Sequence, residues 1–405
     1  MTLKESIQQF VSERYDYYDK WSLDAPVIIT RKVDKELQNL QEIIYKIANE
    51  FATNYQNYKH LMPMKSEVEN IINLCNKKEY KIGTYRTDFV FDESDQMKLI
   101  EITCRFALNG MFQTAIFQER TRRYQEKNYP NETLIDHYSL IVDHFEKYLH
   151  NKKRIIILFG QDVKNESNIY TNIFERTGIE VTKIHYTDIE NHSNKFNDAW
   201  ILSELSFDEI ISLSKDIITK LIEAEITNDF RTIFLIHDKR FFDVLCSKKI
   251  QKKVLSENEI SLLDKYCVRT YRYDKESLEW RSAKQNKNNW IIKHRALGKS
   301  QDIFAGIVTS HENWDEIFKR EDIYEFILQE WIPQKKYPNS IKGKPLNDFV
   351  VGTLLFFDEN FFGLGEFRTS SYPITNKGDH RKAAGLVFKN EIPEDVINKT
   401  MMHDK

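Results

Sequence analysis

The sequence predicts a mixed α/β protein, and three features of the chain indicate this class. Short apolar strands alternate with amphipathic helices over residues 151–236, a β-hairpin precedes them at 84–103, and helical periodicity dominates the first 80 residues. The 405 residues allow two or three domains, at about 150 residues per domain. Hydrophobic residues make up 41% of the chain and aromatic residues 13%, so a substantial buried core is expected.

The first 80 residues carry helix signals. Thr2 and Glu5 have the spacing of a capping box, and apolar residues follow them at helical intervals. A second amphipathic pattern includes Leu37, Leu40 and Ile44. None of these residues suggests chemistry, so this region is predicted to be a helical packing layer.

The hairpin at residues 84–103 is the first place where charged side chains fall in a regular pattern. Arg86 and Asp88 share one face of its first strand, and Glu101 and Thr103 share one face of the second, because alternate strand residues point to the same side. If the register brings these faces together, two carboxylates and a guanidinium converge, as a magnesium–triphosphate group requires. An ordinary cross-strand ion pair is the alternative, and spacing alone favours it.

An α/β layer with a parallel sheet is predicted after the hairpin, because short apolar runs alternate there with helical patterns. The predicted strands are 154–159, 180–185, 199–202 and 232–236, and the predicted helices are 169–176 and 207–224.

A basic strand and loop follow. The strand at 290–293 ends in Lys293 and leads into a loop that contains Gly298, Lys299 and Ser300. Backbone N–H groups and ammonium groups of such a loop suit the phosphates of a nucleotide. The loop is not a P-loop, because position 293 holds lysine where that motif needs its first glycine, and a solvent-exposed turn is equally compatible.

The apolar strand that begins at Phe326 offers backbone and side-chain acceptors at its end, which suits an adenine edge; a sheet strand leaving the core at Pro333 is the alternative. The end of this strand comprises Gln329, Glu330, Trp331 and Ile332.

Glycines gather near the C-terminal end. Of 12 glycines, eight lie between Gly298 and Gly385, which predicts tight turns or a close approach of the backbone to a ligand. Arg368 and Asn376 stand among them and suit a loop that closes on anionic groups.

Several functional classes are disfavoured. With 59 Lys and Arg against 62 Asp and Glu, the net charge of −3 argues against a strongly basic nucleic-acid binder. No apolar run reaches the roughly 18 residues of a membrane span, and the N-terminus lacks a signal-peptide pattern, so a cytoplasmic protein is expected. The four cysteines have no C-x-x-C spacing, so neither a zinc site nor a disulfide framework is indicated.

The order of these signals resembles the circularly permuted ATP-grasp ligases, of which the synthetase module of glutathionylspermidine synthetase is the best-known relative. The R-x-D and E-x-T hairpin comes first, followed by the α/β layer, HDKR at 237–240, WIIK with its loop, LQEWIP and GLGEFR. The resemblance runs from about Gly83 to Leu386. It implies a circularly permuted ATP-grasp fold with an inserted Rossmann-like pre-ATP-grasp layer and an N-terminal helical region.

Four parts of the chain follow from this resemblance. They are an N-terminal helical region at 1–80, a permuted metal- and phosphate-binding part at 81–150, the pre-ATP-grasp-like layer at 151–236, and the nucleotide-binding part and lid at 237–405.

The resemblance also implies a nucleotide site. Lys239 and Lys293 would hold the ATP phosphates from either side of a cleft. Residues 298–300 would form a lid loop, and residues 329–332 would contact adenine.

The resemblance also implies which residues bind magnesium and which contact the reacting group. Asp88 and Glu101 would be magnesium ligands, Arg86 would contact the γ-phosphate or an acyl phosphate, and Arg368 would stabilise the reacting group.

One position departs from the family pattern, because Thr103 stands where the family often has asparagine. A hydroxyl is a poorer magnesium ligand than an amide carbonyl, so Thr103 would act through water, Asn109 would substitute for it, or catalysis would be impaired. Asn109 and Asn376 are also candidates for substrate binding.

The implied activity is an ATP- and Mg²⁺-dependent ligase that joins a small-molecule or peptide carboxylate to an amine through an acyl phosphate, releasing ADP and phosphate. No nucleic-acid or membrane partner is expected. Two alternatives remain open: a phosphotransferase acting on a small-molecule hydroxyl from the same cleft, and a catalytically impaired nucleotide-binding protein.

Overall fold

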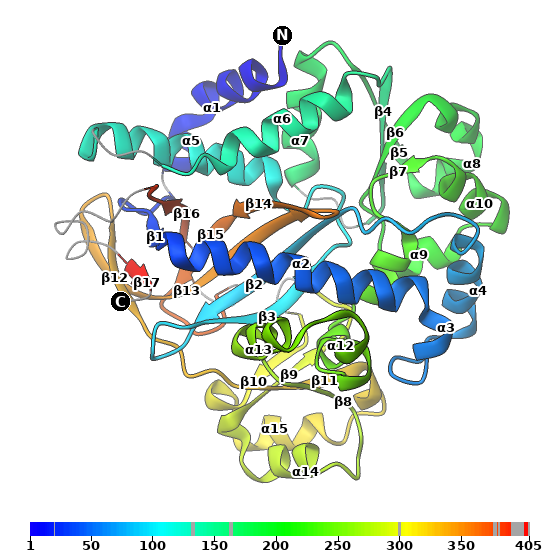
Figure 1. The fold of residues 1–405 in the computed structure, drawn as a ribbon, viewed down its shortest axis with the longest axis vertical. Helices are drawn as coiled ribbons and strands as arrows, with labels where there is room; N and C mark the ends of the chain where they lie inside the picture. The colour runs from blue at the N-terminus through cyan, green and yellow to red at the C-terminus, as the bar shows by residue number, and fades with distance from the viewer. Residues whose placement is uncertain are drawn as a thin grey trace.

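The structure is a computed structural model of the chain (Figure 1). It describes residues 1–19, 21–130, 134–161, 165–298, 301–375, 379, 381–389 and 401–403. Three predicted site residues, Lys299, Ser300 and Asn376, lie outside these ranges. Within them, no helix has the length and apolar character needed to cross a membrane.

The helices are spread along the whole chain. In the described residues they are α1 (Leu3–Asp19), α2 (Arg31–Thr53), α3 (Tyr55–Tyr58), α4 (Ser66–Cys75), α5 (Met111–Asn128), α6 (His137–Leu149), α7 (Asn165–Arg176), α8 (Ile189–His192), α9 (Phe207–Ser212), α10 (Lys215–Glu223), α11 (Phe241–Leu245), α12 (Lys248–Val254), α13 (Glu257–Tyr266), α14 (Leu278–Gln285) and α15 (His311–Ile317). Short 3₁₀ turns are η1 (Tyr186–Asp188), η2 (Ser193–Asp198), η4 (Lys287–Asn289), η5 (Gly306–Val308) and η6 (Ile323–Glu325), and η3 (Thr232–Ile236) is a π-helix.

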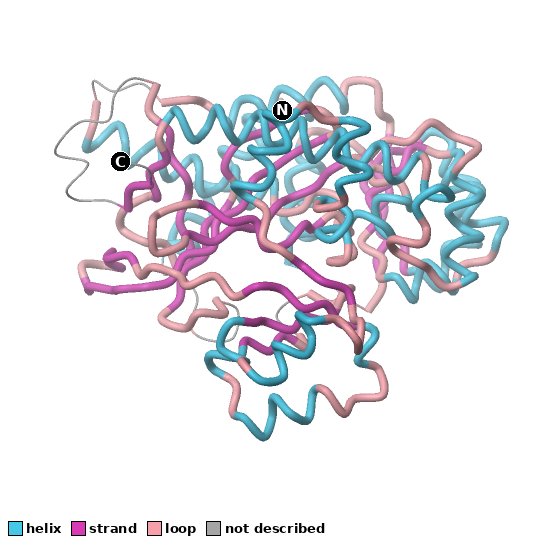
Figure 2. The backbone as a smooth tube through the Cα atoms, turned by 60° about the horizontal axis from the view of Figure 1, so that its bottom comes forward, coloured by secondary structure: helices cyan, strands magenta, loops and turns pink. Residues whose placement is uncertain are grey.

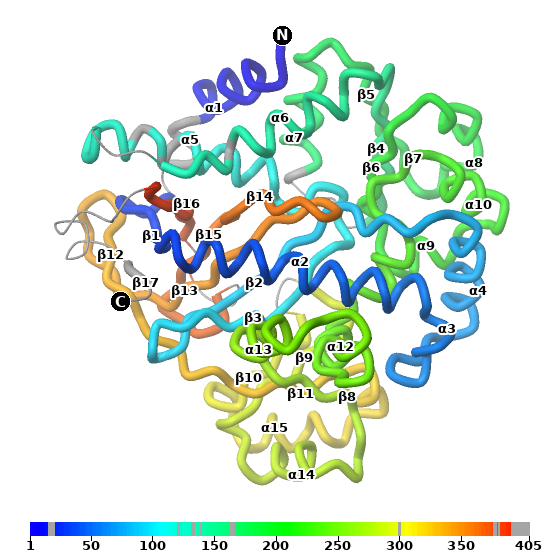
Figure 3. The backbone as a smooth tube through the Cα atoms, in the orientation of Figure 1, coloured from blue at the N-terminus to red at the C-terminus, as the bar shows by residue number. Residues whose placement is uncertain are grey.

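A large mixed sheet forms the centre of the molecule. Its strands are β1 (Val27–Ile29), β2 (Thr84–Phe91), β3 (Met97–Thr103), β12 (Tyr337–Ile341), β13 (Lys344–Phe357), β14 (Asn360–Leu364), β15 (Glu366–Ser370), β16 (Arg381–Val387) and β17 (Met401–His403). The order in the described chain is β17-β1-β16-β15-β13-β2-β3, and β12 and β14 also pair with β13. Strands from both ends of the sequence therefore meet in one sheet, as the blue and red segments of Figure 3 show.

Helices cover both faces of this sheet, and alternate residues of β13 show how. Leu354 and Phe356 belong to a core shared with α2, and the ring of Tyr85 stacks on Phe356 with the centroids 4.8 Å apart. Leu355 and Phe357 point the other way, into a core shared with α1, α5 and α6. Figure 1 shows α2 running across one face, with α5 and α6 beyond it. This alternation is what a strand buried on both sides requires.

A parallel sheet forms the second layer, as the sequence predicts. Its strands are β4 (Arg154–Phe159), β5 (Glu180–His185), β6 (Ala199–Ser203) and β7 (Glu225–Ile226). They pair in the order β5-β4-β6-β7, all parallel. The loops after β4 and β6 leave from the same edge of this sheet, where parallel α/β layers commonly place ligand-binding residues.

A small antiparallel sheet forms the third layer. Its strands are β8 (Thr270–Arg272), β9 (Trp290–His294), β10 (Ile303–Ala305) and β11 (Phe326–Glu330), in the order β10-β9-β11-β8. Ile292 and Leu328 pack toward α14 and α15 in an apolar cluster with Trp280 and Trp314. Because neighbouring strand residues alternate, Lys293 and Gln329 lie on the opposite face. Figure 2 shows this sheet as a separate layer below the large sheet.

Two expectations about secondary structure are wrong. Residues 232–236 form the π-helix η3 and not a strand, with the His237 N–H donating to the Thr232 carbonyl at 3.1 Å. A short, fully buried apolar run has no polar face, so periodicity cannot separate a strand from a buried helix. The first 80 residues are not purely helical either, because β1 pairs in parallel with β16 and β17.

Several finer predictions are confirmed. The hairpin strands have the predicted bounds, and Thr2 and Glu5 exchange the two hydrogen bonds of a capping box. The helix predicted over 207–224 is divided into α9 and α10, because Ser214 caps the second helix at the Ile217 N–H.

Candidate functional site

A cavity of about 1140 Å³ lies where the three sheets face one another. Its lining comes from β2, β3 and β15 of the large sheet, from β9 and β11 of the small antiparallel sheet, and from the loops after β4 and β6. These segments are far apart in the sequence, as their different colours in Figure 3 show. This cavity therefore collects side chains from most of the signals that the sequence contains.

The hairpin register brings the predicted acidic and basic residues together. Arg86 is paired with Thr103, and Asp88 is paired with Glu101 across the two strands. Directly opposite residues of an antiparallel pair share a face, and all four side chains line the cavity. The predicted convergence of these side chains is confirmed, although the chemical role of each residue stays a prediction.

Asp88 is held by two arginines. Arg86 Nε donates to Asp88 Oδ1 at 2.8 Å, and the guanidinium of Arg368 donates to Asp88 Oδ2. Arg368 lies on β15. Val351 of β13 pairs with Arg368 on one side and with Val90 of β2 on the other, so Arg368 lies near the strand that carries Asp88. Only 5% of the Asp88 side chain is exposed, so its charge is neutralised within the protein.

Glu101 meets the basic side of the cavity. Its Oε1 lies 3.1 Å from Lys239 Nζ, and the Lys239 side chain is 2% exposed. Burial alone would raise the pKa of Glu101, but the ammonium groups of Lys239 and Lys293 outweigh it and hold this pKa below its ordinary value. Glu101 is therefore ionised and lies between two lysines.

Lys293 is a buried ammonium group whose hydrogen-bond acceptors are neutral oxygens. Its Nζ donates to Gln329 Oε1 at 2.7 Å and to the Ile100 carbonyl at 3.2 Å. Burial lowers the pKa of Lys293 to about 8, with the charge of Lys239 acting in the same direction and Glu101 opposing it. A desolvated cation at a cavity wall favours an anionic ligand.

Gln329 is hydrogen-bonded within the protein. The residue is 2% exposed, and its amide group donates to Thr270 Oγ1 at 2.8 Å while accepting from Lys293. The side chain thus orients Lys293. The four residues from Gln329 to Ile332 all line the cavity, and their contact with adenine stays a prediction.

Lys239 and Gly298 occupy different places at the edge of the cavity. Gly298 lines it, whereas Lys239 does not and reaches the site through Glu101. The Lys239 ammonium also donates to the Leu297 carbonyl at 2.7 Å, next to Gly298. A Cβ atom at Gly298 would meet nothing within 4 Å, so no close backbone approach requires glycine there.

Asn109 is a buried turn residue at the cavity wall. Its amide nitrogen donates to the Thr84 carbonyl at 3.1 Å, to Thr84 Oγ1 at 2.9 Å and to the Phe106 carbonyl at 2.6 Å. Among the described residues, its Oδ1 accepts no hydrogen bond, although the side chain is buried. This amide oxygen is buried, so it has no partner among the described residues and is not exposed to the cavity.

Several lining residues were not predicted. They come from the segment after β3, from the loops after β4 and β6, and from the turn after η3: Arg105, Gln161, Ser206, Asp208 and His237. Their signal in the sequence is positional, because Gln161 and Ser206 follow the carboxyl ends of predicted parallel strands. The sheet edge could have been predicted, but not which side chains turn toward the cavity.

The oxygen atoms of the hairpin could contribute to a magnesium site but do not form a complete cage. Asp88 and Glu101 are opposite one another, and Thr103 adds a hydroxyl. In the described part of the chain, no group of three or more His, Cys, Asp or Glu side chains is arranged to hold a metal ion. This set suits magnesium bound by one or two carboxylates together with substrate phosphates and water.

Comparison with known proteins supports the fold and says less about the activity. The family of the AnkG N-terminal domain, which is not an ATP-grasp family, matches residues 37–235. None of the curated proteins matches the sequence. A glutathione synthetase-like effector from Globodera pallida, solved in its apo form, has a TM-score of 0.56 at 13% identity, over 94% of this chain and 96% of that one.

At this identity the likeness establishes the fold alone. The chain is a mixed α/β protein whose architecture is similar to that glutathione synthetase-like effector over almost its whole length.

Proposed function

We propose that this protein is an ATP-dependent ligase that joins a carboxylate to an amine through an acyl phosphate, on a circularly permuted ATP-grasp fold. The observation that carries the proposal is that the acidic hairpin and the basic strand meet. Lys293 Nζ donates to the Ile100 carbonyl from 193 residues away, and Lys239 lies 3.1 Å from Glu101. Two distant segments thus supply acidic and basic groups to one cavity.

The cationic side chains would bind the triphosphate. Lys293 lines the basic side of the cavity, and Lys239 acts behind it through Glu101. Arg86 and Arg368 line the large-sheet side. Phosphoryl transfer needs placement and charge neutralisation more than covalent participation by the protein. Lys293 is the strongest candidate, because it lines the cavity, is buried, and donates its hydrogen bonds to neutral oxygens.

Asp88 and Glu101 would hold magnesium together with the phosphates, and the ion would supply further neutralisation of their charge. Thr103 would contribute through water, because the buried amide oxygen of Asn109 is not exposed to the cavity. The arginines at Asp88 orient this carboxylate toward the cavity.

An apolar wall next to Lys293 suits the base of the nucleotide. Ile291, Ile303 and Ile374 form an apolar cluster there, against which Trp331 packs. Planar apolar ligands favour such walls with a few polar groups at the edge. The triphosphate would then run from this cluster past Lys293 toward Asp88 and Glu101.

The carboxylate and amine substrates would occupy the other end of the cavity, where side chains of both charge signs occur. Arg105 offers a cation and Asp208 offers an anion, beside the polar groups of Gln161 and Ser206. A small-molecule or peptide acid and an amine are therefore the proposed substrates.

Hydroxylamine trapping tests the proposal. The protein is mixed with Mg-ATP, a panel of carboxylic acids and hydroxylamine, and ADP, phosphate and hydroxamate are measured, with reactions lacking acid as controls. Equal amounts of ADP, phosphate and hydroxamate are expected. AMP as the sole nucleotide product would contradict the mechanism, and a stable phosphorylated product without free phosphate would favour a phosphotransferase.

A nucleotide-binding protein without catalysis is the second candidate, and Asp88 favours it. Both oxygens of this carboxylate are already engaged by Arg86 and Arg368, and Thr103 is a weak magnesium ligand. ATP binding without any product in the trapping reaction would support this candidate.

A further inference from the structure

The π-helix η3 is flanked by two Asp-x-Arg pairs with the same local geometry. Before it, Asp229 Oδ1 accepts from the Arg231 backbone N–H at 2.7 Å and from its Nε at 3.0 Å, and Oδ2 accepts from its Nη2 at 2.7 Å. After it, Asp238 accepts from Arg240 in the same three ways, at 2.9, 3.0 and 2.8 Å. We call these the first and second clamps.

Both clamps fasten η3 to the N-terminal helical region. Arg231 Nη2 donates to the Lys78 carbonyl at 3.1 Å, just after α4. Arg240 Nη1 donates to the Pro63 carbonyl at 3.0 Å, just before α4. The two clamps therefore perform the same structural task at opposite ends of one short helix.

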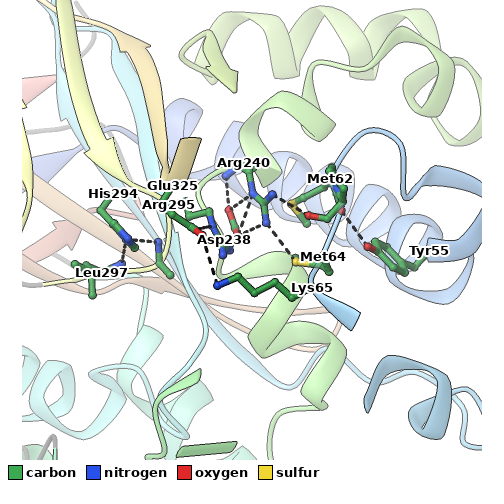
Figure 4. A network of polar contacts seen from close by, with 12 residues as sticks. Tyr55, Met62, Met64, Lys65, Asp238, Arg240, His294, Arg295, Leu297 and Glu325 are labelled. Atoms are coloured by element: carbon green, nitrogen blue, oxygen red, sulfur yellow. Dashed lines mark hydrogen bonds and ion pairs between the residues drawn. The ribbon is translucent and has the colours of Figure 1, made fainter. Parts of the chain in front are cut away.

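Among the residues that the structure describes, only the second clamp has a further charged partner. Arg295 Nη1, which arrives from the end of β9, donates to Asp238 Oδ2 at 2.6 Å, and the Arg295 Nε donates to Glu325. Figure 4 shows Asp238 between Arg240 and Arg295. The Asp238 side chain is 0% exposed, against 13% for Asp229. This carboxylate therefore joins η3 to the small antiparallel sheet.

Lys239 lies between Asp238 and Arg240 in the sequence and is hydrogen-bonded to the segment 294–298. Its backbone N–H donates to the Arg295 carbonyl at 2.9 Å, and its ammonium donates to the Leu297 carbonyl at 2.7 Å. The His294 Nδ1 accepts from the Leu297 N–H at 3.3 Å and tightens the turn that leads to Gly298. Side chain and backbone contacts thus fix Lys239 and residues 294–298 to each other.

We infer that Asp238 is a positioning residue, which holds Lys239 on Glu101 and residues 294–298 at the cavity by binding Arg240 and Arg295 together. The consequence of this positioning role for nucleotide binding rests on the proposed function, whereas the effect of Asp238 on Lys239 does not. Removing its charge leaves the guanidinium of Arg240 without its carboxylate and leaves Arg295 with Glu325 alone, which weakens the link between η3 and β9.

The test compares Asp238→Asn with Asp229→Asn, a matched change in the first clamp. One readout is acetylation of Lys239 by an N-hydroxysuccinimide ester, followed by peptide mass spectrometry. The other is the affinity for a fluorescent ATP analogue. Asp238→Asn is expected to speed Lys239 acetylation and to weaken nucleotide binding by about tenfold each, the scale of a lost charged hydrogen bond, and Asp229→Asn to change neither by more than about twofold.

Arg295→Gln is the second variant in case Asp238→Asn does not fold, because it removes the link to β9 and keeps the local clamp. It is expected to speed Lys239 acetylation in the same way. Equal acetylation rates in the Asp238 and Asp229 variants, or an unchanged rate in Arg295→Gln, would overturn the inference. If the unaltered protein binds no ATP, the proposed function fails, and the acetylation rates still decide the role of Asp238.

Discussion

The two walls of the cavity carry their charges in opposite ways. On the large sheet, Asp88 lies in a row with Arg86 and Arg368, so positive and negative groups neutralise each other at contact distance. On the small antiparallel sheet, Lys293 is buried and bonded to the neutral oxygens of Gln329 and Ile100. The Asp88 carboxylate is thus fully paired, whereas Lys293 is a desolvated cation that an anionic ligand would stabilise beyond the attraction of Glu101.

This difference follows from how each wall is built. The large-sheet wall follows from strand register, which is a local property of paired strands. The small-sheet wall depends on which layers close over Lys293, because burial and the charges of neighbouring side chains, Glu101 foremost, set the pKa of its ammonium group. Three substitutions and one pH titration test this difference between the two walls, in order of decreasing expected effect.

Glu101→Gln removes the anion that connects the walls. Turnover in the trapping reaction is expected to fall by about 100- to 1000-fold, because charge stabilisation at the reacting group is lost. Glu366→Gln is the matched control, since Glu366 lies on the same sheet but pairs with Lys382 at 2.7 Å. Full turnover in Glu101→Gln would show that the reaction does not require this carboxylate and would remove the residue from the mechanism.

Gly352→Ala tests how tightly the large-sheet wall is packed. A Cβ atom there would lie 2.2 Å from the Phe89 ring and 2.6 Å from the Phe367 ring, both buried. The free energy of unfolding is expected to fall by about 1–3 kcal/mol, the usual cost of overpacking. Gly298→Ala, with nothing within 4 Å, should change it by less than about 0.5 kcal/mol in the same denaturant titration.

The pH dependence of ATP binding tests the cation of the small-sheet wall. The pKa of Lys293 is lowered to about 8, so its ammonium is present below that pH and is lost as the pH rises through it. ATP affinity is expected to fall about tenfold between pH 7 and 9. Adenosine, which carries no phosphate, should bind with a flat profile. A flat profile for ATP itself would show that Lys293 does not contact phosphate.

Thr103→Asn is expected to have the smallest effect. An amide oxygen is a better magnesium ligand than a hydroxyl, so the magnesium concentration for half-maximal ATP binding should fall by about two- to fivefold. Isothermal titration calorimetry, with magnesium titrated at a fixed ATP concentration, measures this magnesium concentration. A rise in this concentration would indicate that Thr103 itself already provides the better ligand.

Much of the fold could be predicted from the sequence. The hairpin alternates as strands do, and the strands at Arg154–Phe159 and Phe326–Glu330 and the parallel layer were indicated by short apolar runs between helical patterns. The π-helix at Thr232–Ile236 could not be predicted, because five buried apolar residues satisfy a strand and a helix equally. Strand β1 was missed because three residues are too few for a pattern.

In the candidate site, local geometry could likewise be predicted from the sequence, and contacts between distant segments could not. The sequence by itself determined that Arg86 and Asp88 share a face, and that Asp238 sits two residues from Arg240, because spacing along a chain fixes local geometry. Only the tertiary structure decided that Arg295 meets Asp238 and not Asp229, that Gln329 binds Lys293, and that Lys239 contacts Glu101. These pairings depend on how three sheets pack, and packing of distant segments leaves no periodic trace in the order of residues.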